Sequence, residues 1–255
     1  MKLYYEQKGT GPYLVLLHGL FGSQDNLAVM ARAAEADFTV ISMDLRNHGQ
    51  SPHSDTMSYP KMAEDVLNTL PAEAEQFFLL GHSMGGKVAM QLALDHPERV
   101  KALIVADIAP VAYDSRHDGI IKAMQQVSID SITQRSEAEQ QLAQSIPEKG
   151  VRQFLLKNLK RQDDQLVWRC HLSAIAACYA EVLKAPEGAS RYPHPVLFIK
   201  GANSDYILPE HQQPIRQLFP KAQAKIIHGA GHWLHAEKPA AFTKLVLDFL
   251  HDNLR

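Results

Sequence analysis

The chain of 255 residues is long enough for one large α/β domain, and its 45% hydrophobic and 21% charged residues are typical of a soluble globular protein. A net charge of −2 gives no reason to expect nucleic acid or an anionic membrane as a partner. Because no apolar run approaches ~18 residues and the N-terminus lacks a signal-like apolar segment, we expect a cytoplasmic protein without membrane insertion.

Short apolar runs alternate with helical patterns along most of the chain. The expected strands are 2–7, 14–17, 38–43, 77–80, 100–106, 195–200 and 224–227. The expected helices are 26–36, 58–70, the one that precedes Asp95, 209–219 and 239–250. Strands that alternate with helices favour a parallel sheet with right-handed crossovers. The sequence therefore predicts the α/β fold class.

The alternation stops between residues 111 and 190, where the pattern is of amphipathic helices without a convincing strand. An insertion after the carboxyl end of a strand would lie over the crevice in which such sheets place their sites. We therefore expect residues 1–110 and 191–255 to form the core, and residues 111–190 to form a helical cap that is not an independent domain.

The segment from residue 77 to residue 90 has the pattern of a buried strand, a sharp turn and a buried helix. Its turn, G-H-S-M-G at 81–85, fits G-x-S-x-G. A serine at such a turn has a strained backbone, and Gly81 and Gly85, which lack side chains, leave room for neighbouring backbone to approach the turn closely. The hydroxyl of Ser83 would stand at a helix N-terminus, where backbone N–H groups point outward. This geometry suits a nucleophile whose product is an oxyanion.

Acyl transfer by a serine needs a base, a carboxylate that orients the base, and donors for the oxyanion. His232 is the strongest base candidate, because it lies in a glycine-containing loop directly after the last expected strand. Asp107 and Asp205 compete for the carboxylate role, since each follows an expected strand and keeps the chain order Ser, Asp, His. The backbone N–H groups of Leu20 and Met84 are the candidate oxyanion donors.

Five segments can be taken together: H-G-L-F-G-S at 18–23, D-L-R-N-H-G-Q-S at 44–51, G-H-S-M-G-G-K at 81–87, D-I-A-P at 107–110 and G-A-G-H-W-L-H-A-E-K-P at 229–239. This combination spans nearly the whole chain and resembles the α/β-hydrolase superfamily, specifically the YbfF-type esterases. The resemblance implies the α/β-hydrolase fold, with a mostly parallel central sheet, helices on both of its faces and a helical cap.

The resemblance also implies a Ser–His–Asp hydrolase of carboxylic esters, or of acyl thioesters such as acyl-CoA, without a cofactor. On the matching positions it makes Ser83 the nucleophile, His232 the base and Asp107 the acid, with Leu20 and Met84 as oxyanion donors. Asp205, at a position where many relatives lack an acid, stays as the alternative to Asp107.

Two other functions use the same features. A hydrolase that splits a carbon–carbon bond would use the same triad, and a ligand receptor on a hydrolase scaffold would bind without turnover. Epoxide hydrolases and haloalkane dehalogenases are similar in fold but use an aspartate nucleophile, so Ser83 argues against both.

The remaining expectations concern ligands and assembly. The thirteen histidines show no metal-ligand spacing, and we expect Cys170 and Cys178 to be free, buried thiols. The expected partner is a small-molecule ester or thioester, and the chain is expected to be a monomer or a small homo-oligomer. The residues expected to line the substrate pocket are Phe21, Tyr113, Trp168 and Trp233.

Overall fold

A seven-stranded sheet in the order β1-β3-β2-β4-β5-β8-β9 forms the centre of the molecule. The computed structural model describes residues 1–188 and 191–254, so residues 189 and 190 of the expected cap and residue 255 of the core lie outside the described residues. The strands of this sheet are β1 Tyr5–Lys8, β2 Tyr13–Leu17, β3 Thr39–Met43, β4 Phe77–His82, β5 Val100–Ala106, β8 Val196–Gly201 and β9 Ala222–Ile227. Only β1 is antiparallel to its neighbour, so the prediction of a mostly parallel sheet is confirmed.

Helices cover both faces of the sheet, as parallel strands require. In β2, Leu14 and Leu16 point to the face covered by α1 and α11, whereas Val15 and Leu17 point to the face covered by α2 and α3. The core helices are α1 Ala28–Ala34, α2 Tyr59–Thr69, α3 Met84–Asp95, α9 Gln212–Leu218, α10 Leu234–Glu237 and α11 Pro239–Asp252. Two short 3₁₀ helices, η1 Gln24–Leu27 and η3 Pro209–His211, precede α1 and α9. Among the described residues, no helix is both long and apolar enough to cross a bilayer.

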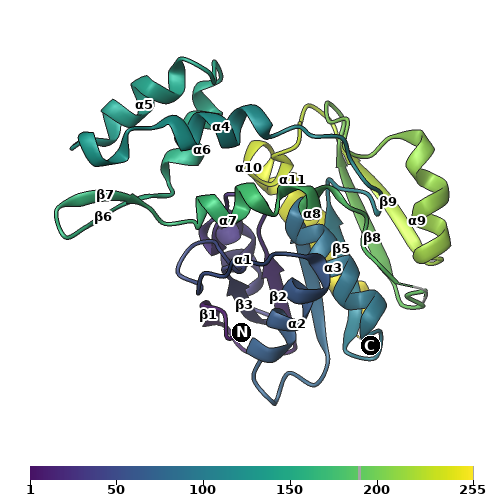
Figure 1. Ribbon diagram of the computed structural model, residues 1–255. Helices are drawn as coiled ribbons and strands as arrows, with labels where there is room; N and C mark the ends of the chain where they lie inside the picture. The colour runs from purple at the N-terminus through teal and green to yellow at the C-terminus, as the bar shows by residue number, and fades with distance from the viewer. Residues whose placement is uncertain (189–190, 255) are drawn as a thin grey trace.

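The segment between β5 and β8 carries its own group of elements. They are α4 Asp118–Gln126, η2 Ile129–Ser131, α5 Arg135–Ala143, α6 Lys149–Leu156, β6 Leu159–Gln162, β7 Gln165–Trp168, α7 Leu172–Ala177 and α8 Tyr179–Leu183. Figure 1 shows α4, α5, α6 and the β6–β7 hairpin together at one end of the molecule, with α7 and α8 leading back across the core. We call residues 111–188 the insert.

The prediction that the insert contains no strand is wrong. β6 and β7 pair as an antiparallel hairpin, and the two residues between them, Asp163 and Asp164, have φ angles of 47° and 64°. Two consecutive left-handed residues are what a tight hairpin turn requires, and aspartate tolerates that conformation. The turn escaped detection because it lacks the glycine that usually marks such hairpins.

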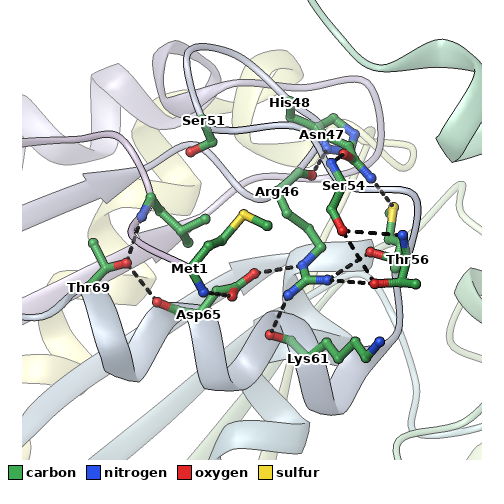
Figure 2. Close-up of polar contacts among 12 residues, drawn as sticks. Met1, Arg46, Asn47, His48, Ser51, Ser54, Thr56, Lys61, Asp65 and Thr69 are labelled. Carbon is green, nitrogen blue, oxygen red and sulfur yellow. Dashed lines mark hydrogen bonds and ion pairs between the residues drawn. The ribbon is translucent and has the colours of Figure 1, made fainter.

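The polar loop 44–51 joins the sheet to α2 and to the insert. Figure 2 shows Arg46 extending from this loop to α2, where its Nε donates to Oδ2 of Asp65 at 2.6 Å. Its Nη1 donates to the carbonyl of Thr56, which precedes α2, at 2.7 Å. The carbonyl of Asn47 accepts from the backbone N–H of His171 at 2.9 Å. These contacts hold the start of α7 against the carboxyl edge of the sheet.

Candidate active site

Ser83 lies at the sharp turn between β4 and α3, as the glycine spacing predicts. Its φ angle is 53°, a left-handed conformation that costs an ordinary residue energy unless the surroundings impose it. A Cβ on Gly81 would lie 2.1 Å from the carbonyl oxygen of Gly85, and a Cβ on Gly85 would lie 2.4 Å from the carbonyl oxygen of His18. Both positions therefore exclude any side chain, and the turn can pass this close to β2 only with glycine there.

His232 connects Ser83 to Asp107. Its Nε2 lies 2.9 Å from Oγ of Ser83, and its Nδ1 lies 2.7 Å from Oδ2 of Asp107. Asp107 follows β5, has a φ angle of 52° and is 0% exposed. With Nδ1 donating to a carboxylate, the neutral imidazole presents Nε2 as an acceptor for the serine proton. The three side chains come from segments far apart in the sequence and meet at the carboxyl edge of the sheet.

Two donors besides His232 hold the Asp107 carboxylate. The backbone N–H of Gly201 donates to Oδ1 at 2.9 Å, and the hydroxyl of Ser204 donates to Oδ2. A buried carboxylate that accepts several hydrogen bonds is stabilised in its charged form. The end of β8, at Gly201, and the loop after it, at Ser204, therefore support the site.

Asp205 lies in the same loop but pairs with a different residue. Its Oδ1 accepts from Nη1 of Arg116 at 2.6 Å, and its side chain is 70% exposed. The hydrogen bond from Arg116 lowers the pKa of Asp205 below its usual range. The carboxylate that contacts His232 is thus Asp107, and the one that the structure pairs with Arg116 is Asp205.

Two residues that sequence reasoning did not select contact His232. The ring of Tyr206 stacks on that of His232 at 3.8 Å, with 17° between their planes. Nε2 of His82 lies 2.8 Å from the backbone carbonyl of His232. Burial, followed by the nearby His235 and His232, keeps the pKa of His82 well below its usual range, so His82 is neutral and donates through Nε2. No sequence signal marks Tyr206, whereas His82 sits inside the G-x-S-x-G motif itself.

The candidate oxyanion donors lie on either side of Ser83, with Leu20 in the loop after β2 and Met84 at the start of α3. Leu20 and Met84 line a cavity together with Ser83, and Met84 is the first residue of α3, where backbone N–H groups have no intrahelical acceptor. His18 braces the loop that carries Leu20, because its Nδ1 donates to the carbonyl of Gly19 at 2.8 Å while its Nε2 accepts from the N–H of Leu45 at 3.0 Å. Burial lowers the pKa of His18 to about 4, so it stays neutral in this role.

Ser83 opens onto two cavities. The small cavity has a volume of about 40 Å³ and is lined by residues of α2, α3 and α8 and of the chain after β2, β4, β5 and β8: Leu20, Tyr59, Ser83, Met84, Lys87, Ile108, Tyr113, Asp114, Arg116, His117, Tyr179, Val182, Leu183 and Tyr206. The large cavity has a volume of about 600 Å³, and its lining includes Phe21, Ser83, Ile120, Val151, Phe154, His232 and Trp233.

The four residues expected to line the substrate pocket do not all line the same cavity. Tyr113 lines the small cavity, and Phe21 and Trp233 line the large one. Trp168 is the last residue of β7 and, in the described part of the chain, lines neither cavity. Trp168 pairs with Leu159 at the base of the hairpin and is half-buried against the core, and its contact with the substrate stays a prediction.

Other reactive side chains lie outside this arrangement. Within residues 1–188 and 191–254, no group of three or more His, Cys, Asp or Glu side chains has the geometry to hold a metal ion. Cys170 and Cys178 are free, as expected, but only Cys170 is buried and Cys178 is half-buried.

Comparison with known proteins agrees with the geometry. A family model described as the alpha/beta hydrolase fold matches residues 12–239. The chain is 42% identical to the sn-1-specific diacylglycerol lipase ABHD11 of Xenopus laevis, over 96% of this chain and 82% of that protein. It is 41% identical to esterase YbfF of Escherichia coli K12, over 94% of this chain and 93% of that one.

A solved structure described as a marine microorganism esterase superposes with a TM-score of 0.94 at 40% identity, covering 97% of this chain and 99% of that chain. Sequence and fold thus agree on one family, and the relatives in it carry the names of esterases and lipases. The chain belongs to the α/β-hydrolase family and, within it, to the carboxylesterase-type hydrolases.

Proposed function

We propose that this protein hydrolyses carboxylic esters through an acyl-enzyme on Ser83. The observation that carries the proposal is the continuous hydrogen-bonded chain from Oγ of Ser83 through His232 to Asp107, with distances of 2.9 Å and 2.7 Å. A serine, a base on its hydroxyl and a buried carboxylate behind the base are the parts that serine acyl transfer needs.

The reaction runs in two stages. Oγ of Ser83 attacks the ester carbonyl while Nε2 of His232 takes the hydroxyl proton, and the backbone N–H groups of Leu20 and Met84 stabilise the oxyanion. His232 then gives this proton to the departing alkoxide, which leaves as an alcohol. Water, activated by the same nitrogen, attacks the acyl-enzyme and releases the carboxylic acid, restoring the free serine.

Asp107, rather than Asp205, is proposed as the acid that orients His232. Its support is the contact with Nδ1 and its complete burial, which makes its charge act on the imidazole with little screening. Asp205 is exposed and paired with Arg116, so solvent and the guanidinium together reduce the effect of its charge on His232.

We also propose that residues 1–110 and 191–255 act as the catalytic core and that residues 111–190 act as a cap. The support is that Tyr113, Val182 and Leu183 of the insert line the small cavity, while Val151 and Phe154 line the large one. The cap then excludes water and limits the size of the substrate.

Acyl thioesters such as acyl-CoA remain within this proposal, because a thiolate leaving group passes through the same acyl-enzyme. A carbon–carbon bond hydrolase would use the same three side chains on a diketone and differs only in substrate. A ligand receptor would bind without releasing product, so the presence of turnover separates it from both enzymes.

The experiment is a stopped-flow measurement of p-nitrophenol release combined with covalent labelling. An acyl-enzyme predicts a burst of about one p-nitrophenol per active site where deacylation is slow. A fluorophosphonate should add its mass to one peptide, the one that contains Ser83, and Ser83→Ala should abolish this label. Labelling of another residue, or turnover that survives in Ser83→Ala, would overturn the proposal.

A further inference from the structure

The two cavities beside Ser83 differ strongly in size, at about 40 Å³ and about 600 Å³. A water molecule needs roughly 10–15 Å³ of such volume, so the small cavity has room for only a few water-sized groups. A short alkyl chain fits there, whereas the large cavity can hold a ring system or a long chain. An ester has two sides, and each must enter one of these cavities.

The position of His232 indicates which cavity takes the acyl side of the ester and which takes the alcohol side. If Ser83 works by acyl transfer as proposed above, Nε2 of His232 must deliver a proton to the oxygen of the leaving alcohol. The alcohol therefore lies on the His232 side of the ester carbonyl, and the acyl chain points away from it. Among the described residues, His232 belongs to the lining of the large cavity and not to that of the small one.

We infer that the small cavity binds the acyl group and the large cavity binds the alcohol, so that the substrates are esters of short-chain acids with bulky, largely apolar alcohols. This inference rests on the proposed function and adds the substrate class to it. The apolar lining of the large cavity supports a hydrocarbon alcohol and includes Phe21, Ile120, Val151, Phe154, Leu155 and Trp233.

The walls of the small cavity are tied together by buried hydrogen bonds. Oη of Tyr59, on α2, donates to the carbonyl of Val182 at 2.5 Å. Nζ of Lys87, on α3, donates to the carbonyl of Leu183 at 3.2 Å and also to that of Lys184. The end of α8 is thus held to two helices of the core. Widening the small cavity would leave these buried groups unpaired, which opposes the entry of a longer acyl chain.

The same bonds occupy three of the polar side chains of the small cavity, whose lining also includes Asp114, Arg116 and His117. Tyr59 and Lys87 direct their donors at carbonyls of the chain, and Oη of Tyr113 accepts from the N–H of Ala109 at 2.8 Å. Much of the remaining lining is hydrocarbon, contributed by residues such as Ile108 and Val182. A short, uncharged alkyl chain fits this surface better than a polar group does.

The test compares two isomers, hexyl acetate and ethyl hexanoate, which contain the same atoms and both release a simple aliphatic alcohol. They differ only in the side of the carbonyl that carries the long chain. We expect kcat/KM, followed by proton release at constant pH, to favour hexyl acetate by about tenfold or more, since discrimination per methylene in a confined pocket reaches that size. Equal rates, or a preference for ethyl hexanoate, would overturn the assignment of the cavities.

A matched pair of variants tests which cavity sets the preference for acyl-chain length. Val182→Ala enlarges the small cavity, and Val151→Ala makes the same change in the large one. Val182→Ala should raise kcat/KM for ethyl hexanoate relative to ethyl acetate by about tenfold. Val151→Ala should leave that ratio unchanged and alter the ranking of acetates of different alcohols. The reverse pattern, or the same effect in both variants, would contradict the inference.

The comparison of isomers in the wild-type protein does not depend on how the variants fold. It also separates this inference from the proposed function. Hydrolysis of both isomers at similar rates, abolished by Ser83→Ala, would leave the esterase proposal standing and overturn only the division of the site. Hydrolysis of neither isomer, nor of any shorter ester, would overturn both.

Discussion

The carboxyl edge of the sheet and the insert differ in how their backbones are used. Four non-glycine residues with left-handed φ angles follow β2, β3, β4 and β5 in turn: Phe21, Asn47, Ser83 and Asp107. In the described part of the insert, only the hairpin turn at Asp163 and Asp164 is left-handed outside glycine. Such conformations persist where the surrounding packing imposes them, and a rigid sheet can do so.

From this difference we expect the sheet edge and the insert to have separate roles. The loops at the strand ends hold the side chains of Ser83, His232 and Asp107 in one hydrogen-bonded chain, at a cost in backbone energy. The insert contributes helices of ordinary geometry that line the cavities. Changes at the sheet edge should therefore alter turnover, and changes in the insert should alter which ester is turned over. The following predictions test that contrast.

The largest effect is expected for Ser83→Ala. Loss of a triad nucleophile costs on the order of 10⁴–10⁶ in turnover, because attack on the ester then has no activated oxygen. Initial rates with p-nitrophenyl acetate measure this loss, and the melting temperature checks that the fold is intact. A variant that keeps a tenth of the activity would mean that another residue is the nucleophile.

The next largest effect should separate the two aspartates. Asp107→Asn should lower kcat by about 10³–10⁴, because an amide opposite Nδ1 favours the wrong tautomer of His232. Asp205→Asn, the same substitution at the residue directly after Ser204, should change kcat by less than about tenfold, since only an exposed ion pair with Arg116 is lost. Steady-state kinetics of both variants decide the matter, and the reverse order would refute the choice of Asp107.

A smaller effect at the sheet edge is expected for His82, which we treat as a positioning residue. His82→Leu removes the donor that holds the carbonyl of His232, so kcat should fall by about 10- to 100-fold with KM nearly unchanged. His82→Gln retains an N–H donor and should recover part of the loss. His235→Leu provides a matched control, because the ring of His235 lies edge-on to His82 at 4.4 Å. Equal losses in all three variants would indicate a packing role only.

The smallest effect concerns Lys87, which joins the core to the insert. Burial lowers the pKa of Lys87 to about 7, from the 10.5 of an unfolded lysine. Between these values the unfolded chain binds one proton more than the folded protein, so the free energy of unfolding rises with pH across this window, by up to about 1.4 kcal/mol per pH unit. Below about pH 7 both states hold the charge, and the cost of burying it is fully present.

Urea unfolding of the wild type and of Lys87→Met, at about pH 6.5 and about pH 8.5, measures this term. Relative to the variant, the wild type should gain about 1–2 kcal/mol between the two conditions. A difference between the proteins that is independent of pH would show that Lys87 retains an ordinary pKa.

The site was only partly predictable from sequence. The turn at Ser83 and the loop of His232 carry local signals, namely glycine spacing and a position directly after a strand. Asp107 and Asp205 both follow an expected strand, so the residues alone did not show which of the two carboxylates contacts His232. The structure distinguishes them by the direction of each side chain: the Asp107 carboxylate faces His232, and that of Asp205 faces Arg116.

The contacts that support His232 had still weaker signals. Tyr206 and Ser204 lie in an ordinary polar loop, and their contacts with His232 and Asp107 depend on how the loop after β8 folds back. Trp168 had no specific signal either. It ends β7 beside Leu159, half-buried against the core and outside the lining of both cavities.

The residues alone predict the alternation of strands and helices, the parallel sheet and the sharp turn at Ser83, because these depend on residues close together in the chain. Hydrophobic periodicity and glycine spacing extend over a few residues, so they can be recognised directly in the sequence. Contacts across the fold fix which aspartate contacts His232 and which aromatic residues line the two cavities. Those outcomes depend on contacts between segments about a hundred residues apart, such as Asp107 with His232 and Tyr59 with Val182, and on side-chain directions that no local pattern specifies.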